Sequence, residues 1–441
     1  MRSPDPVSRG AGRTVIRGAR CALGPRESAP VSIEIIDGCV TYLGTESCAS
    51  SMARLGQAEI DLSGFLVMPG LINAHDHLQF ALHPRVADPP YRNYVDWGED
   101  IHAKFPDVLA KHRTVPKAVR LWWGGLRNLL CGVTTVSHHD QLWPELQREE
   151  FPVRVVQDCG WGHSLELGGD LREARATTPE GSAFILHACE GVDEQARAEI
   201  FKLDALGLLD ARTVLVHGLA VDVEGVELMR ARGTSLIICP SSNNFLFGRT
   251  PDVTLFRAIG NVALGNDSPL TSEGDLMDEV RFAIRCCGIA AEAAYHMITD
   301  VPAAMLGLGG SEGTIKVAGR ADLTAVRDTG RDAAERLRTM SIADVELVMI
   351  GGRVQLASEA MFARISALER EGMEPLWIDG IVRWLRAPVK AILQSAEDVL
   401  GAGNVRLGGR PVRIPEILEA GCGCSSATAK ERLGAGSSIF V

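Results

Sequence analysis

Several features are scarce or absent in this 441-residue chain, and each absence excludes a class of protein. Aromatic residues make up only 5% of it, and no apolar run approaches the roughly 18 residues that a membrane-spanning helix needs. The N-terminal residues lack the apolar stretch of a secretory signal. The net charge is -11, without a long run of either sign, which argues against nucleic acid and an anionic membrane as partners. We therefore expect a cytoplasmic protein that acts on a small molecule, and this composition is compatible with a homo-oligomer.

The cysteines do not form a pattern that indicates disulfides. There are eleven of them, scattered without a repeating interval, and several lie inside apolar runs, where a free thiol behaves as a small apolar side chain. We expect reduced thiols. Apolar residues make up 46% of the chain and charged residues 23%, as in an ordinary globular enzyme. Because 441 residues exceed the usual size of one domain, the composition predicts two structural units.

Short strand-like segments occur near the beginning of the chain and return after its middle. Residues 14–67 contain several of them, separated by turns that contain glycine. A similar texture returns at residues 321–326 and 347–350. We predict that both stretches build one composite β-sandwich, made of residues 1–67 and 316–357.

Between these stretches, apolar runs of four to eight residues alternate with helical segments. This pattern is typical of parallel strands that crossover helices bury on both faces. Seven strand ends can be recognised, at or near His75, His138, Cys159, His187, His217, Cys239 and Asp267. Residues 161–183 leave room for one short element only, where a complete barrel would carry a whole strand and helix. The predicted fold class is therefore α/β, with a (β/α)8-type (TIM-like) barrel over residues 68–315 that has one reduced unit.

The end of the chain has a different texture. Trp377, Ile381, Trp384 and Leu385 recur with the spacing of one helical face. We predict a C-terminal helical extension over residues 358–441, with a flexible tail.

Polar residues that end apolar strands are the candidates for chemistry. In His75-Asp76-His77, a strand places the two histidines on one face. Three further apolar runs end at His187, His217 and Asp267. Active sites in such barrels form at the carboxyl ends of the strands. Each of these residues alone would usually be structural, but together and in strand order they indicate a metal site.

Short motifs surround these residues in a fixed order. They are Pro69-Gly70-Leu71-Ile72-Asn73-Ala74-His75-Asp76-His77, Gly132-Val133-Thr134-Thr135, His187-Ala188-Cys189-Glu190, Val216-His217-Gly218, Cys239-Pro240-Ser241-Ser242-Asn243 and Leu264-Gly265-Asn266-Asp267-Ser268. In order and spacing they resemble the amidohydrolase superfamily, within it the branch of cytosine, guanine and S-adenosylhomocysteine deaminases and triazine hydrolases. The resemblance extends from about Thr14 to Gly352.

The resemblance implies a mononuclear metal site. The residues that match the family's ligands are His75, His77, His187 and Asp267. The carboxylated lysine that bridges two metals in other branches has no counterpart in the strand texture of this chain. We therefore expect one divalent ion. Zinc is the default for three histidines and one aspartate, and Fe2+ also accepts nitrogen and oxygen ligands.

The resemblance also implies catalytic roles. Glu190 matches the acid that shuttles a proton, and His217 matches the residue that contacts the attacking water or the substrate. Asp267 combines metal binding with removal of the water's proton. A metal makes hydroxide available at neutral pH, and an acid such as Glu190 can protonate a leaving nitrogen.

Four further residues are candidates for substrate binding: Gln79, His138, Trp161 and Asn243. Gln79 lies two residues after His77, and an aromatic face such as that of Trp161 suits a flat heterocycle. Each has a plain alternative, because His138 and Trp161 could simply pack in the core and Asn243 could form a turn. The reduced unit also prevents the transfer of any relative's specificity to this chain.

Three hypotheses about function follow. The leading one is a hydrolase that removes ammonia or an amine from an aminated heterocycle. The second keeps the same metal site and cleaves a cyclic or linear amide. The third is a non-catalytic scaffold on a hydrolase fold, which is disfavoured because such a protein has no need to retain ligands, acid and histidine together. The presence of Glu190 favours deamination.

Overall fold

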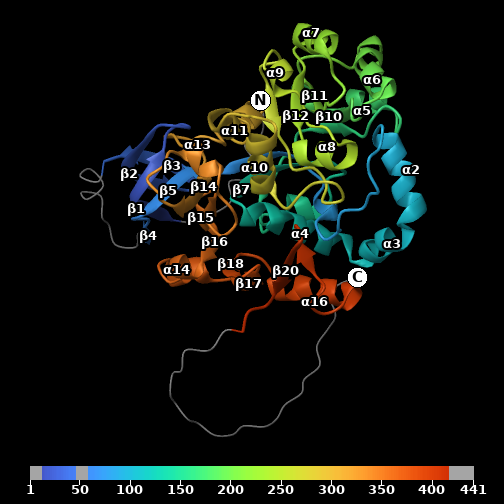
Figure 1. Ribbon diagram of the computed structural model, residues 1–441. Helices are drawn as coiled ribbons and strands as arrows, with labels where there is room; N and C mark the ends of the chain where they lie inside the picture. Colours follow the sequence, from blue (N-terminus) through green and yellow to red (C-terminus); the bar gives the residue numbers. More distant parts are fainter. Residues whose placement is uncertain (1–11, 46–57, 417–441) are drawn as a thin grey trace.

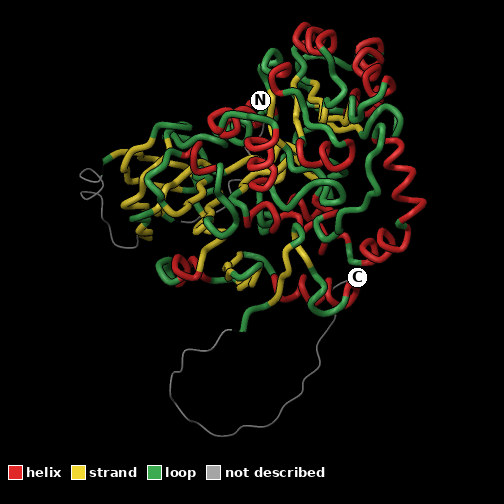
Figure 2. Tube along the Cα trace, viewed as in Figure 1, coloured by secondary structure: helices red, strands yellow, loops and turns green. Residues whose placement is uncertain are grey.

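The computed structural model describes residues 12–45 and 58–416. Strands from both ends of the chain, blue and orange in Figure 1, lie together at one side of the molecule. Helices and parallel strands from the middle of the chain form the other side, which we call the parallel-strand unit (Figures 1 and 2). The predicted flexible tail, at residues 417–441, lies outside the described residues.

A mixed sheet of twelve strands combines the two ends of the chain. Its members are β1 (Arg13–Ala22), β2 (Ser28–Ile36), β3 (Cys39–Gly44), β4 (Ala58–Asp61), β5 (Phe65–Pro69), β14 (Leu323–Arg327), β15 (Val345–Ile350), β16 (Arg353–Ser358), β17 (Glu374–Ile378), β18 (Ile381–Leu385), β19 (Arg406–Leu407) and β20 (Arg410–Arg413). β5 pairs with β1 on one side and with β14 on the other, so it joins the early and late strands. The prediction that both ends build one β-module is confirmed. The strands form one continuous sheet, where the sequence predicted a sandwich.

The parallel-strand unit contains eight short strands. They are β6 (Leu71–Asp76), β7 (Val133–His138), β8 (Arg154–Val155), β9 (Gly160–Gly162), β10 (Phe184–Ala188), β11 (Thr213–His217), β12 (Ser235–Ile238) and β13 (Val262–Leu264). One ladder runs from β6 through β7 to β8, and a second from β9 through β10, β11 and β12 to β13. The two ladders meet where Asp76 and Asp267 form a parallel bridge, with the Asp267 N–H donating to the His75 carbonyl at 3.0 Å.

The reduced unit lies between β8 and β9. Only four residues, 156–159, separate these strands, and no helix lies between them. Among the described strands, no ladder joins β8 to β9. The short α5 (Leu171–Thr177) then leads into β10. The sequence predicted the reduced unit at residues 161–183, which carry the end of β9 and α5, whereas the connection without a helix lies earlier, at 156–159. The strand that the sequence did not resolve is β9.

Helices cover the parallel strands and follow most of them along the chain (Figure 1). They are α2 (Tyr94–Lys104), α3 (Pro106–Thr114), α4 (Lys117–Leu130), α5, α6 (Glu194–Ala205), α7 (Val223–Arg232), α8 (Pro240–Phe247), α9 (Val253–Phe256), α10 (Leu276–Cys286), α11 (Ala291–His296) and α12 (Asp300–Met305). Caps explain several boundaries: the Asp275 and Asp278 side chains form a capping box at α10, and α7 ends at Gly233 in the left-handed region. Within the described residues, no helix combines the length and the apolar character needed to cross a membrane.

The C-terminal region corrects one prediction. Residues 374–385 form the hairpin β17–β18, where helical spacing predicted a helix. The turn at Asp379-Gly380 explains the error, because both residues have positive φ, of 45° and 88°. An Asp-Gly pair in that conformation is the preferred two-residue hairpin turn. Part of the C-terminal region is helical, as α14 (Glu359–Phe362) and α15 (Ala367–Arg370) before the hairpin and α16 (Val389–Leu400) after it. The helix α13 (Ala333–Leu337) lies before this region.

A buried ion pair fixes β6 against α4 and β13. Arg127, on α4, donates to Asp76 Oδ1 at 2.7 Å and to the Asp267 carbonyl at 3.2 Å. The other carboxylate oxygen of Asp76 accepts from Asn128 at 2.8 Å and from Asn73 at 3.1 Å. The side chains of Asp76 and Arg127 are 0% and 2% exposed, so this charge pair is shielded from water.

Removing one partner of this pair should destabilise the fold strongly. Arg127→Leu would leave the Asp76 carboxylate buried without its cation, so we expect the free energy of unfolding to fall by about 3–5 kcal/mol. Urea unfolding followed by circular dichroism measures it. Arg232→Leu is the matched control, because the Arg232–Asp204 pair is half-exposed and should contribute less than about 1 kcal/mol. Equal losses in the two variants would show that Arg127 acts only through its apolar stem.

Candidate metal centre and active site

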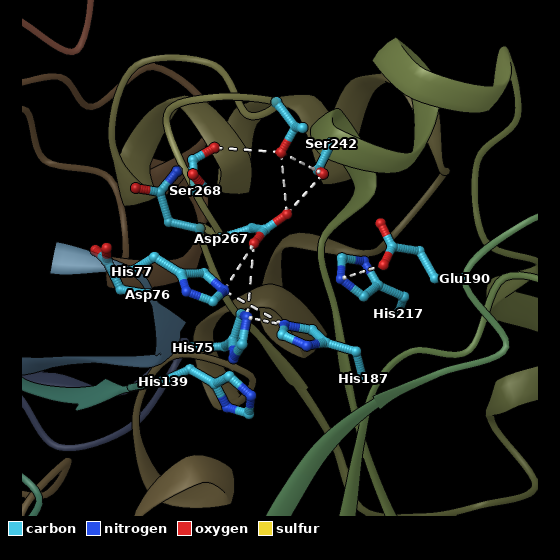
Figure 3. A network of polar contacts seen from close by, with 12 residues as sticks. His75, Asp76, His77, His139, His187, Glu190, His217, Ser242, Asp267 and Ser268 are labelled. Atoms are coloured by element: carbon cyan, nitrogen blue, oxygen red, sulfur yellow. Dashed lines mark hydrogen bonds and ion pairs between the residues drawn. The ribbon is translucent and has the colours of Figure 1, made fainter. Parts of the chain in front are cut away.

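Four side chains that can bind a metal converge at one end of the parallel strands (Figure 3). They are His75, His77, His187 and Asp267. All are buried, and one ligand atom from each lies within 4.8 Å of the others. The Nε2 atom of His187 lies 3.2 Å from that of His75 and 3.3 Å from that of His77. Asp267 Oδ1 lies 3.6 Å from Nε2 of both His75 and His77.

Strand geometry brings these side chains together. His75 lies on β6, and His77 follows one residue after the strand ends. His187 lies near the end of β10. Asp267 comes three residues after β13, at the bridge to β6. Because neighbouring parallel strands end on the same edge, residues far apart in sequence meet there.

Hydrogen bonds orient two of the ligands. The Nδ1 of His187 lies 3.0 Å from the His163 carbonyl. A carbonyl can only accept, so Nδ1 carries the proton and the lone pair on Nε2 faces the cluster. Ser242 donates to Asp267 Oδ2 at 2.7 Å, and Thr271 donates to the same oxygen at 3.2 Å. Oδ1 of Asp267 therefore stays directed at the histidines.

The protonation states suit a divalent cation. Burial lowers the pKa of His77 and of His187 well below the ordinary value, and the neighbouring histidines lower it further. Burial opposes ionisation of Asp267, but its hydrogen bond with His75 and the nearby histidines outweigh burial and hold its pKa well below the ordinary value. Neutral imidazoles and an ionised carboxylate are the forms that bind metals. The donor set therefore fits a metal such as zinc.

A carboxyl group and a histidine lie beside this cluster. Glu190 Oε2 is 3.5 Å from His217 Nε2, and both side chains are buried (Figure 3). Asn243 Nδ2 donates to His217 Nδ1 at 3.1 Å, which leaves the ring proton on Nε2, facing Glu190. Burial lowers the pKa of His217 to about 4. Burial raises the pKa of Glu190 well above its ordinary value, and the charges of Asp267 and Glu199 raise it further.

The backbone is strained at this edge. Cys189, His217 and Asp267 have positive φ angles, of 54°, 75° and 56°. Non-glycine residues rarely adopt this conformation, and when they do it is often at functional sites, where the surrounding structure holds them in place. At these positions the chain turns sharply as it leaves β10, β11 and β13, and the turn directs the side chains of His217 and Asp267 into the site.

Comparison with known proteins finds one matching family model. The model described as "Amidohydrolase family" matches residues 162–355, which include His187, Glu190, His217 and Asp267. This part of the chain is therefore similar to the amidohydrolase family.

Relatives in sequence include proteins named as deaminases and as imidazolonepropionases. The 5-methylthioadenosine/S-adenosylhomocysteine deaminase of Haloarcula marismortui is 28% identical over 62% of this chain and 75% of its own length. The imidazolonepropionase of Mesorhizobium japonicum is 27% identical over 68% of this chain and 86% of its own. The chain is therefore similar in sequence to proteins named as deaminases and as imidazolonepropionases.

Solved structures show the same fold. An adenosine deaminase from Xanthomonas campestris with bound zinc has a TM-score of 0.65 at 17% identity, covering 88% of this chain and 97% of its own. The atrazine chlorohydrolase of Arthrobacter aurescens, complexed with zinc, has a TM-score of 0.66 at 16% identity, covering 88% and 99%. At such identities the likeness concerns the fold alone.

The four predicted substrate contacts have different surroundings in the structure. Asn243 is hydrogen-bonded to His217, so it touches the candidate machinery directly. Trp161 is 37% exposed, and its ring lies 5.5 Å from that of His139. Gln79 is buried, and within the described structure its side-chain oxygen has no hydrogen-bond partner. Both ring nitrogens of His138 are buried and equally without a partner there.

His139, one residue after β7, is a further neighbour of the metal cluster. Its ring centroid lies 4.3 Å from that of His187 and 4.9 Å from that of His75. Its Nε2 donates to the Gly162 carbonyl at 3.1 Å. His138 pairs in register with Asp76, whose side chain points away toward α4. Side chains alternate along a strand, so His139, one residue further, faces the ligands. Strict alternation after β7 is the sequence signal for this placement of His139.

A buried carboxyl group supports the segment that holds Asp267. Glu279, on α10, accepts from the N–H of Ser241 at 2.7 Å and also from the Ser241 hydroxyl. Ser242, the next residue, is the one that donates to Asp267. Glu279 is 0% exposed, and burial raises its pKa to about 8 against the hydrogen bonds from Ser241.

This raised pKa predicts a pH dependence of stability. Between the ordinary pKa of 4.5 and the folded value of about 8, the unfolded chain releases a proton that folded Glu279 keeps. Stability from this group is therefore complete below pH 4.5 and is lost as pH rises toward 8, by up to about 1.4 kcal/mol per pH unit. Glu279→Gln should remove that slope. Urea unfolding at intervals between pH 5 and about 8 measures it, and parallel curves for both proteins would contradict the assignment.

Proposed function

We propose that this protein is an amidohydrolase that removes ammonia or an amine from an aminated heterocycle by hydrolysis. The observation that carries the proposal is the placement of Glu190 and His217, 3.5 Å apart, beside a buried cluster of three histidines and an aspartate. A hydrolase needs a site that activates water and a group that protonates the leaving nitrogen. The two sets of residues supply these two requirements.

The metal would be held by the four clustered residues. These are His75, His77, His187 and Asp267. Zinc is the proposed ion, supported by the donor set and by zinc in the structural neighbours; Fe2+ is the alternative with the same donors. When bound, a divalent cation lowers the pKa of water to about 7 and so supplies hydroxide at neutral pH.

Proton transfer would be divided between two carboxyl groups. Asp267, the ionised one, accepts the proton of the attacking water. Glu190, which burial keeps protonated, donates to the leaving nitrogen. His217 carries its proton on Nε2, so it can donate a hydrogen bond to an oxygen or nitrogen bonded to the carbon under attack, and Asn243 holds the ring in that state. Low solvent exposure strengthens each of these interactions.

The fold and its divisions belong to the same proposal. We infer that the eight parallel strands form a (β/α)8-type barrel over residues 68–315, in which the step from β8 to β9 lacks its helix. The β-module would then comprise residues 1–67 and 316–357, with residues 358–441 as a C-terminal extension whose strands β17 to β20 continue the same sheet.

Amide hydrolysis is the second candidate. The relative named imidazolonepropionase favours it. The two reactions share the metal cluster and differ in the bond that breaks. An assay for ammonia release across pterins, purines, pyrimidines and triazines, beside an assay for ring opening of cyclic amides, separates them. Ring opening without ammonia release would overturn deamination.

Metal content should follow the ligand cluster. We expect about one equivalent of divalent metal per chain, because the four donor residues converge on one point. His187→Ala should lose metal and activity, since it removes a ligand. His296→Ala is the matched control, because that histidine pairs with Asp300 outside the cluster. Elemental analysis of the purified proteins measures the content, and two equivalents at full activity would contradict a mononuclear site.

The role of Glu190 predicts a selective loss. Glu190→Gln should keep its metal and its substrate affinity while kcat falls by roughly 10²- to 10⁴-fold, the usual worth of an acid–base group. The loss should be smaller for a chloro-substituted triazine than for the amino-substituted one, because chloride leaves without protonation.

Glu346→Gln, a buried carboxyl in the mixed sheet paired with Arg327, is the control and should leave kcat unchanged. Steady-state kinetics with both triazines measures the effect. Equal losses for the two leaving groups would refute the assignment of Glu190 as the acid, and loss of metal would make Glu190 structural.

A further inference from the structure

A cavity of about 320 Å³ lies beside β9, outside the ligand cluster. Its lining includes Trp161 and His163, Gly169, and Leu171 and Ala174 of α5. Small-molecule sites in proteins begin at about this volume. The cavity lies between β9, the loop that follows it and α5.

The cavity adjoins the metal cluster. The ring of His163 lies 5.1 Å from that of His187, and the His163 carbonyl accepts the hydrogen bond from the same ligand. The ring of Trp161 lies 5.5 Å from that of His139, which in turn lies 4.3 Å from that of His187. The cavity is therefore separated from a metal ligand by about one side chain. A heterocycle with a substituent is long enough to reach from the cluster into the cavity.

The cavity wall is apolar. Trp161 is 37% exposed, which is uncommon for so large an apolar side chain in this structure. The charged residue in the wall, Asp170, caps α5 by accepting from the N–H groups of Arg172 and Glu173. No lysine or arginine lines the cavity within the described residues. Such a surface gains most from contact with an uncharged aromatic or branched aliphatic group.

We propose that this cavity is a substrate subsite that binds an apolar substituent, aromatic or branched aliphatic, on the heterocycle whose reacting carbon lies at the metal cluster. The inference rests on the proposed function, because it assumes that a small heterocycle occupies the cluster. Trp161 is then a specificity residue, which contacts the substituent and takes no part in proton transfer. Substrates with a charged or strongly hydrated arm at that position bind poorly.

A glycine in the wall allows a clean test. A Cβ atom at Gly169 meets no heavy atom within 4 Å, so a larger side chain there occupies space without forcing the backbone apart. Gly309 provides a matched control, because a Cβ there is equally unobstructed and the residue lies after α12, outside the cavity wall. Gly169→Leu should fill the cavity, and Gly309→Leu should not affect it.

Two measurements use these variants. The first is binding of benzyl alcohol, a small aromatic probe without a reacting group, followed by saturation-transfer NMR. The second is kcat/KM for 9-benzyladenine and for 9-methyladenine. We expect benzyl alcohol to bind the wild type and Gly309→Leu, and to bind Gly169→Leu at least about 10-fold more weakly. The preference for the benzyl over the methyl substrate should fall about 10-fold in Gly169→Leu, through KM.

The outcomes separate this inference from the proposed function. Benzyl alcohol binding that is absent in the wild type, or equal in the wild type and Gly169→Leu, overturns the subsite. An unchanged benzyl-to-methyl preference in Gly169→Leu also overturns it. If benzyl alcohol binding depends on Gly169 but neither adenine releases ammonia, the cavity binds apolar groups and the proposed deamination is the part that has failed.

Discussion

The ion pair between Arg127 and Asp76 is the constraint on which the site depends. Asp76 lies between His75 and His77 in sequence, so its side chain sets the position of the strand that carries both histidines. The same guanidinium holds the carbonyl of Asp267. One buried cation from α4 therefore fixes three of the four clustered residues relative to each other. A buried ion pair contributes little net stability against an apolar replacement, but losing one partner is costly. In this protein the ion pair serves mainly to fix the positions of the clustered residues.

Much of the fold could be predicted because strand patterning is local. Parallel strands buried on both faces give uninterrupted apolar runs, and polar residues that end those runs mark one edge of the sheet. The strand at β9 escaped prediction, because its three residues include two glycines and form no apolar run. The hairpin at residues 374–385 was misread because its apolar residues also fit helical spacing. There the turn conformation at Asp379-Gly380 decided the structure.

The residues of the site also differ in whether the sequence predicts them. The residues of the cluster could be found in sequence because each ends a strand, and the edge of a sheet brings strand ends together. Contacts from other elements carried no such signal. The hydroxyl of Ser242 on Asp267, the carbonyl of His163 on His187 and the amide of Asn243 on His217 depend on how loops and helices pack over that edge. Packing of this kind is a property of the whole fold, and residue spacing does not encode it.

The unpaired junction between β8 and β9 has an evolutionary consequence. No ladder crosses it among the described strands, so residues can be inserted or removed there without breaking hydrogen bonds between strands. The clustered residues belong to β6, β10 and the end of β13, which other ladders and the Asp76–Asp267 bridge hold in place. Residues 164–170, which follow β9, also lie outside every described ladder, so descendants of this protein can exchange them and alter which molecules are accepted while the reacting groups stay where they are. The substrate range can thus change in one part of the chain while another part keeps the reacting groups in place.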